Sequence, residues 1–138
     1  MVVNVFTSCF KKASSLDSSK YLVVSISRFN PRGFNGVSLK SLAPSRQLLS
    51  AYKKGISWEE YSKRYHLECL SSSIVKVALK SLLSLTHGRD IVLCCYESPS
   101  MNCHRFLLAD FIQERFGYNV RELVWSIVSP FNVFVYDG

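Results

Sequence analysis

Residues 94–105 bring together most of the side-chain types in this chain that could carry out chemistry. The segment holds three of the five cysteines and one of the three histidines, with a glutamate and an arginine. Cys103, His104 and Arg105 are consecutive, and a thiol beside basic groups at a helix start is partly ionised and can act as a nucleophile or redox group. Glu97 and His104 could exchange protons with a substrate. We therefore expect the chain to act through this segment.

The neighbouring sequence predicts how this segment is positioned. An apolar run at 90–95 precedes a short loop containing serine and proline, and a helically periodic stretch at 108–116 follows it. We predict a buried strand, a loop and a helix that begins near Asn102. Ligands of open α/β sheets bind at such strand-to-helix turns, where the free N–H groups of the helix attract anions.

The cysteines of the segment leave several roles open. The alternative to a reactive Cys103 is a small buried residue that packs its helix onto the sheet, the usual fate of a free cysteine. Cys94 and Cys95 should point to opposite faces of their strand, so at most one can face Cys103. A Cys95–Cys103 disulfide is an alternative that we do not favour. We expect no metal, because the spacing matches no zinc knuckle and the adjacent Cys103 and His104 should not converge easily from one helix.

Three arginines suggest an anion site. Arg28 and Arg32 follow a predicted strand that would end at the same sheet edge, and Arg105 lies on the first turn of the facing helix. Guanidinium groups that converge there would hold a phosphate or a carboxylate. The structural alternative pairs Arg28 or Arg32 with Glu97 or Glu68, which would hold loops together.

Aromatic side chains accompany these arginines. Phe29 and Phe34 flank the arginine-bearing loop and are candidates for stacking on a base. Trp58 and Tyr65 follow helical spacing, and we expect them to be packing residues of the core.

Composition narrows the class of protein. The 138 residues include 17 Lys and Arg against 10 Asp and Glu, a formal net charge of +7, and 48% are hydrophobic. These values favour a single domain over residues 1–138 and an anionic partner such as a nucleotide or nucleic acid. No apolar run approaches the ~20 residues that span a bilayer, and the first residues lack the basic region of a signal peptide. We therefore expect no membrane partner. Because the cysteine count is odd and Cys94 and Cys95 are adjacent, we expect a cytoplasmic protein with reduced thiols.

The pattern of apolar residues predicts alternating elements. Strands are predicted at 2–10, 21–27, 91–95 and 119–123, and helices at 44–55, 57–69, 73–85 and 102–116. Residues 35–42 should be a loop or a short irregular piece, and 124–136 an edge strand or packed tail broken by Pro130. The buried stripe of the third helix is predicted to contain Ile74, Val77, Ala78, Leu82 and Leu85. Strands separated by helices predict a three-layer, Rossmann-like α/β domain with a mostly parallel sheet flanked by helices.

Two blocks of short motifs occur in a specific order. The first block is Ile26-Ser27-Arg28-Phe29-Asn30-Pro31-Arg32-Gly33, Leu42-Ala43-Pro44-Ser45, and Trp58-Glu59-Glu60-Tyr61 with Arg64, Tyr65 and Glu68. The second block is Cys94, Cys95 and Glu97 followed by Cys103-His104-Arg105. Over about residues 21–118, these blocks resemble the family called domain of unknown function 488, a group of small bacterial and phage-type α/β proteins. Ser27 and Asn30 stand where the family pattern has an acidic residue and a tryptophan. The resemblance therefore implies a fold and a site more than a reaction.

Together the residues predict a domain that binds, and could sequester, a phosphate-bearing nucleotide-like molecule or a nucleic-acid end in a basic cleft. The alternative is a thiol-dependent or acid/base enzyme that acts on a nucleotide or nucleic acid through Glu97, Cys103 and His104. A protein-interaction module with core cysteines is a third interpretation, and no cofactor is expected. The predicted ligand-binding residues are Arg28, Phe29, Asn30, Arg32, Phe34, Cys95, Tyr96, Glu97, His104 and Arg105.

Overall fold

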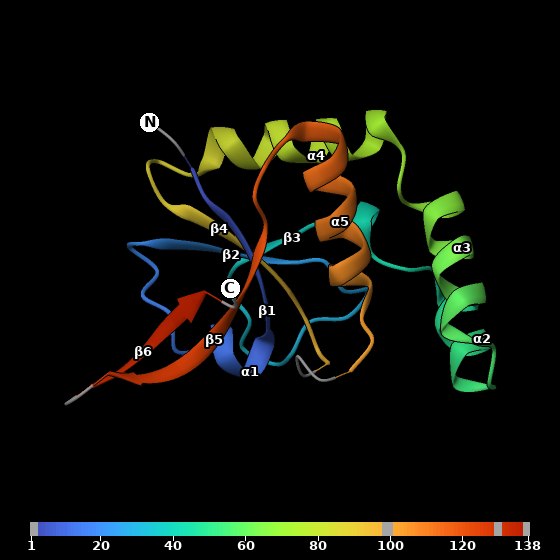
Figure 1. Ribbon diagram of the computed structural model, residues 1–138, viewed down its shortest axis with the longest axis horizontal. Coiled ribbons are helices and arrows are strands. Elements are labelled where there is room, and N and C mark those ends of the chain that lie inside the picture. The colour runs from blue at the N-terminus through green and yellow to red at the C-terminus, as the bar shows by residue number, and fades with distance from the viewer. Residues whose placement is uncertain (1–2, 98–100, 129–130, 137–138) are drawn as a thin grey trace.

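The chain folds around a mostly parallel β-sheet whose two longest helices lie on one face (Figure 1). The computed structural model describes residues 3–97, 101–128 and 131–136. The elements, in chain order, are β1 (Val5–Cys9), α1 (Phe10–Ala13), β2 (Tyr21–Ser25), β3 (Val37–Ser38), the 3-10 helix η1 (Lys40–Leu42), α2 (Arg46–Lys53), α3 (Trp58–Glu68), α4 (Ser72–Leu85), β4 (Asp90–Cys95), α5 (His104–Phe116), β5 (Arg121–Val128) and β6 (Phe131–Tyr136).

The sheet has the order β3-β2-β4-β1-β5-β6. The first five of these strands are parallel, and β6 is antiparallel to β5. The register places Cys9 beside Cys95 and Ser25 beside Cys94, so β1, β2 and β4 end at the same edge. The central strands are apolar and buried on both faces, as parallel strands between layers must be. The predicted Rossmann-like α/β fold with a mostly parallel sheet is confirmed.

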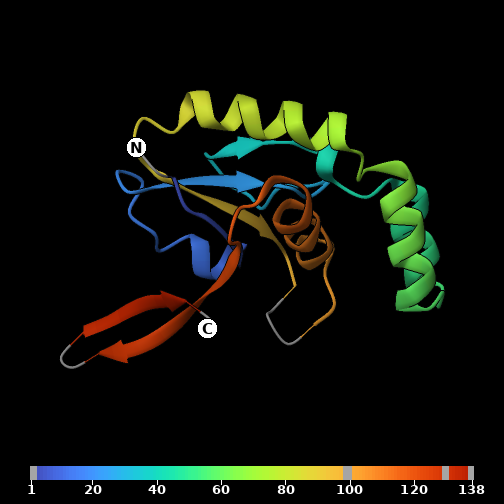
Figure 2. The same cartoon turned by 45° about the horizontal axis from the view of Figure 1, so that its top comes forward.

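The two faces of the sheet are covered unequally. On one face, Leu82 of α4 and Leu108 of α5 pack in one core with Leu93 of β4. On the other, the single-turn helix α1 packs Phe10 against Val92. Figure 2 shows α4 and α1 on opposite sides of the sheet, with the antiparallel pair α2 and α3 standing at one end. Within the described residues, no helix combines the length and apolarity needed to cross a membrane.

The predicted buried stripe of α4 was partly wrong. Ala78 and Leu82 are buried as expected, but Val75 and Leu79 complete the stripe. Val77 is 65% exposed, and Ile74 and Leu85 are also exposed. The apolar residues of α4 form two overlapping stripes, each with the spacing of a helix face. Only the stripe that packs against the sheet is buried.

Several strand boundaries differ from the prediction. β1 begins at Val5, and the predicted start at residue 2 lies outside the described residues, as does Pro130. Residues 35–42, predicted as a loop or a short irregular piece, contain the two-residue strand β3 and the 3-10 helix η1. The short β3 can approach β2 because residue 36 is a glycine, and a Cβ there would collide with the carbonyl oxygen of Val23. Residues 124–128 continue β5, and residues 131–136 form β6, which pairs with β5 as a hairpin and is an edge strand of the sheet, as one of the two alternatives predicted.

The helix starts are set locally by serine caps. Ser45, Ser57 and Ser71 each accept a hydrogen bond from the backbone N–H three residues later. Such caps satisfy N–H groups that the first turn of a helix leaves without a partner. The predicted beginnings of α2 and α3 are confirmed.

Candidate functional site

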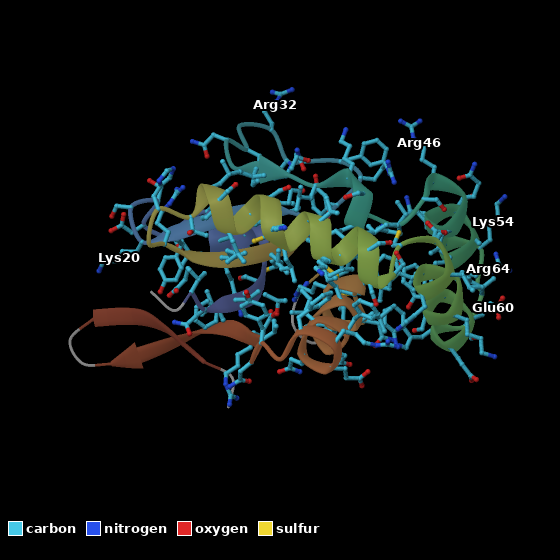
Figure 3. All side chains as sticks on the ribbon, turned by 90° about the horizontal axis from the view of Figure 1, so that it is seen from above. Lys20, Arg32, Arg46, Lys54, Glu60 and Arg64 are labelled. Carbon is cyan, nitrogen blue, oxygen red and sulfur yellow. A yellow bond between two sulfur atoms is a disulfide. The ribbon has the colours of Figure 1, made fainter. Side chains whose placement is uncertain are left out.

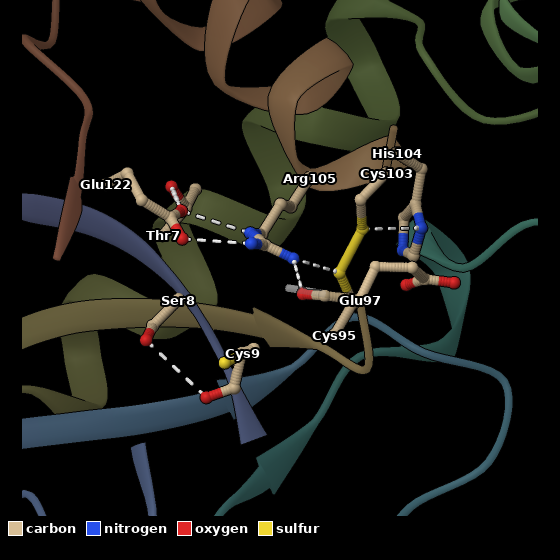
Figure 4. Close-up of polar contacts among 9 residues, drawn as sticks. All are labelled: Thr7, Ser8, Cys9, Cys95, Glu97, Cys103, His104, Arg105 and Glu122. Atoms are coloured by element: carbon tan, nitrogen blue, oxygen red, sulfur yellow. Dashed lines mark hydrogen bonds and ion pairs between the residues drawn. A yellow bond between two sulfur atoms is a disulfide. The ribbon is translucent and has the colours of Figure 1, made fainter. Parts of the chain in front are cut away.

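The cysteines and the histidine that we expected to carry out chemistry lie where β4 ends and α5 begins. Cys95 is the last residue of β4, Cys103 is the N-cap of α5, and His104 is its first residue. The backbone of Cys103 is extended, with φ −150° and ψ 144°. Its side chain therefore does not follow the helical 100° rotation relative to His104, and both side chains point to the same place (Figure 4). The expectation that two adjacent residues would not converge was wrong for this reason.

Cys95 and Cys103 are joined by a disulfide. The alternative that the sequence did not favour is therefore the one the structure contains, and the expectation of reduced thiols does not hold for this pair. Alternation along β4 turns Cys95 toward α5 and Cys94 toward the opposite core, as predicted. Cys9, Cys69 and Cys94 are free and buried.

His104 is a buried, neutral histidine at the base of this site. Its Nε2 lies 2.6 Å from the carbonyl oxygen of Ile26, and its Nδ1 lies 3.7 Å from Sγ of Cys103. A carbonyl can only accept, so Nε2 carries the proton and Nδ1 keeps a lone pair. Burial lowers the pKa of His104 to about 4. At neutral pH the imidazole is therefore an acceptor at Nδ1, not an acid.

Arg105 is fully buried and completely engaged. Its Nε and Nη2 donate to the two carboxylate oxygens of Glu122 at 3.0 and 2.9 Å. Its Nη1 donates to Sγ of Cys95 at 2.9 Å and to the backbone oxygen of Glu97 at 2.7 Å (Figure 4). Thr7 also donates to Glu122, at 2.6 Å. Arg105 therefore organises the interior and does not face a ligand.

The structure separates the three arginines that the sequence grouped as an anion site. Arg28 lies against the η1–α2 connection, donating to the carbonyl oxygens of Pro44 and Ala43 at 3.3 and 3.5 Å. Arg32 projects outward from the loop before β3 (Figure 3). The alternative also fails within the described part of the chain, because no ion pair joins Arg28 or Arg32 to Glu97 or Glu68.

A cavity of about 90 Å³ opens beside the disulfide, and we call it the aromatic pocket. One wall of the pocket is made of aromatic rings in contact. The ring of Trp58 stacks on that of Tyr61 with centroids 5.0 Å apart, and the centroids of Tyr52 and Tyr61 are 4.9 Å apart. Polar groups and the disulfide complete the lining. The pocket is lined by Ser27, Arg28, Phe29, Pro44, Leu49, Tyr52, Trp58, Tyr61, Tyr96, Glu97, Asn102, Cys103 and His104.

The aromatic pocket contains some of the predicted ligand residues and excludes others. Arg32 and Phe34 instead line a larger hollow of about 710 Å³ on the α1 side of the sheet. Asn30 accepts a hydrogen bond from the Ser25 hydroxyl and holds its own loop. The sequence did not identify Tyr52 or Asn102 as site residues. Trp58, which it assigned to the core, packs against the core and also lines the pocket. The prediction that Tyr65 belongs to the core is confirmed, since its side chain is fully buried.

A protein-family model matches most of the chain. The family description that matches is "Active DUF488-N3 subclade", over residues 8–116. The chain belongs to the DUF488 family. No curated protein and no solved structure matches it.

The structure gives the DUF488 motifs of this chain physical roles. In Ala43-Pro44-Ser45, the first two carbonyl oxygens receive the Arg28 guanidinium, and Ser45 caps α2. Glu68 accepts from the backbone N and the hydroxyl of Ser45 at 2.7 and 3.0 Å, which ties the end of α3 to the start of α2. The first motif block thus fixes the wall of the aromatic pocket, and the second block supplies its floor.

Proposed function

We propose that this DUF488 chain binds a nucleotide-like ligand by inserting the base into the aromatic pocket. The observation that carries the proposal is the combination of stacked rings with a carboxylate and an amide in one cavity. Ligand pockets for whole small molecules measure roughly 300–1,000 Å³. A cavity of about 90 Å³ therefore suits one planar ring, with the rest of the ligand outside it.

The polar groups of the pocket suit a base and a phosphate in different places. Aromatic stacking contributes about 1–3 kcal/mol per base. Glu97 would accept from an amino or ring N–H group of the base, as carboxylates do with cytosine. Arg28 is the cation of the lining, and we assign the phosphate to it. Because nucleotides are abundant there, we place this function in the cytoplasm.

The proposal is tested by fluorescence titration with nucleoside monophosphates. The chain has two tryptophans, so a Trp125→Phe background leaves Trp58, in the pocket wall, as the reporter. A monophosphate should quench Trp58, whereas inorganic phosphate alone should not. Arg28→Gln should weaken binding of the nucleotide by about 10- to 150-fold, the equivalent of one charge-assisted hydrogen bond. The same substitution should weaken binding of the matching nucleoside much less, because the nucleoside has no phosphate and loses only the support that Arg28 gives to the pocket wall.

Arg32→Gln is the matched control, because Arg32 is a cation of the other hollow. It should not alter nucleotide binding. If Arg28→Gln and Glu97→Gln both retain full affinity while Arg32→Gln loses it, the ligand binds on the α1 side and the proposal is wrong.

A second candidate is a thiol-dependent enzyme, favoured by the presence of Cys103 and His104 in the same pocket lining. In the reduced protein, Nδ1 of His104 faces Sγ of Cys103 and would take its proton as the sulfur attacks, acting as a general base during the step rather than holding a standing thiolate. The word "Active" in the family description agrees with this candidate. Incubation of the reduced protein with excess nucleotide, followed by chromatography, distinguishes the two. Conversion that disappears in Cys103→Ser supports the enzyme, and intact ligand supports the binder.

A further inference from the structure

Three buried ligand atoms converge at the floor of the aromatic pocket. The two sulfur atoms of Cys95 and Cys103 and a ring nitrogen of His104 all lie within 4.8 Å of one another. A zinc ion with Zn–S bonds of about 2.3 Å and Zn–N bonds of about 2.0–2.1 Å holds tetrahedral nitrogen and sulfur ligands roughly 3.6 Å apart. The observed distance of 3.7 Å between Nδ1 of His104 and Sγ of Cys103 matches this separation.

The orientation of His104 also suits a metal ligand. Its Nε2 donates to the carbonyl oxygen of Ile26 at 2.6 Å, so the lone pair lies on Nδ1, the atom that faces the sulfurs. Histidines that bind metals almost always donate their other ring N–H to a carbonyl or carboxylate, which fixes the ring and its tautomer. The Ile26 carbonyl supplies that contact from the residue after β2, so the ring is already held in the tautomer that binds a metal through Nδ1.

The surrounding charges are compatible with a cation. Two thiolates balance the charge of a divalent ion. The nearby Arg105 guanidinium is neutralised by the two-point pair with Glu122 and donates to Sγ of Cys95 at 2.9 Å. An N–H donor to a thiolate sulfur is a supporting contact of the kind that orients metal ligands. Two sulfurs and one imidazole select thiophilic ions of the zinc class over calcium or magnesium.

We propose that, in the reduced protein, Cys95, Cys103 and His104 bind one zinc-class divalent ion. A phosphine and water break the S–S bond to give two thiols and a phosphine oxide, and the ion then displaces both thiol protons. Cys103 and His104 line the aromatic pocket, so the fourth position of the ion opens toward it. Three protein ligands with one open position is the arrangement of catalytic rather than structural zinc sites. The metal site does not depend on nucleotide binding.

The test uses cobalt(II) as a spectroscopic probe on the full chain, with no nucleotide present. The protein reduced by a phosphine should bind one cobalt ion, with thiolate-to-cobalt charge-transfer absorption and the strong visible bands of a tetrahedral site. Zinc should displace the cobalt and abolish both the charge-transfer absorption and the visible bands. Native mass spectrometry of the reduced protein with zinc should show one added ion and the loss of two protons. The disulfide form should bind cobalt at least about 100-fold more weakly, because two ligands are blocked.

Single substitutions then locate the site. Cys103→Ala and His104→Gln should each weaken binding by about 100-fold or more, and Cys103→Ala should also reduce the charge-transfer band. Cys94→Ala is the matched control, since Cys94 neighbours Cys95 but faces the other core. The oxidised and reduced forms of the unaltered chain provide the same comparison if a variant does not fold. Equal cobalt binding in both forms, no binding in the reduced form, or loss of binding in Cys94→Ala alone would overturn the proposal.

Discussion

Arg105 and Glu122 form a two-point ion pair in the interior, with side chains 0% and 6% exposed. The pair joins the first turn of α5 to the start of β5 and also fixes the Cys95 sulfur through the remaining nitrogen of the guanidinium. A buried pair of this kind need not add much net stability, but removing one partner leaves an uncompensated charge in the core.

We expect Glu122→Gln to lower the free energy of unfolding by about 3–5 kcal/mol, because the guanidinium of Arg105 would remain buried without its counter-charge. Urea denaturation of the disulfide form measures this change. The matched control is Glu60→Gln, which breaks the exposed Arg64–Glu60 pair on α3 and should cost only about 0.3–0.5 kcal/mol. Similar losses in the two variants would mean that the interior pair is not energetically distinct from a surface pair.

The depressed pKa of His104 makes stability depend on pH. Burial holds the folded pKa near 4, whereas the ordinary value is 6.5. Above pH 6.5 the ring is neutral in both states and contributes no pH dependence. Between pH 6.5 and 4 the unfolded chain binds a proton that the folded chain does not, so stability should fall by up to about 1.4 kcal/mol per pH unit.

The contribution of His104 is measured by comparing urea unfolding of the disulfide form and of its His104→Gln variant across this range. The variant should lose stability less steeply on acidification, while His66→Gln, at an exposed histidine, should match the parent protein. A His104→Gln profile parallel to that of the parent would contradict the assignment.

The free cysteines should differ from the disulfide pair in reactivity. Burial raises the pKa of Cys69 to about 12 and also raises that of Cys94. Since the thiolate is the reactive form, neither should react quickly. After reduction, iodoacetamide should label Cys103, which borders the aromatic pocket, before Cys69 or Cys94, as peptide mapping by mass spectrometry would show. Without reduction, Cys103 should remain unlabelled until the chain is unfolded and reduced.

Features set by neighbouring residues were predictable from sequence. The serine caps of α2 and α3 depend on contacts three residues apart, and the opposite orientations of Cys94 and Cys95 follow from the alternation of a strand. The position of the candidate site at the strand-to-helix turn followed from the order of the elements. These inferences needed no knowledge of how distant segments pack.

Features set by distant partners were not predictable. The sequence suggested that Arg105 faces a ligand. In the structure its charge is neutralised by Glu122, which lies 17 residues later in the chain. The outward course of Arg32 depends on the loop that joins β2 to β3, and the assembly of Tyr52 with Trp58 depends on how α2 packs against α3. Glu122, the second residue of β5 and the neighbour of the buried Leu123, is the signal that could have indicated an interior partner for an arginine.

The path of β5 has a consequence for local opening of the chain. β5 shares two register pairs with β1, at Arg121 and Glu122, and six with β6, from Leu123 to Val128. Backbone amides that depend only on the hairpin can exchange by separating β5 from β6, without disturbing the central strands. Deuterium uptake should therefore divide the chain into two classes, a slow one in β1 and β4 and a faster one in β6. The boundary should fall within β5 itself, just after the glutamate that anchors Arg105.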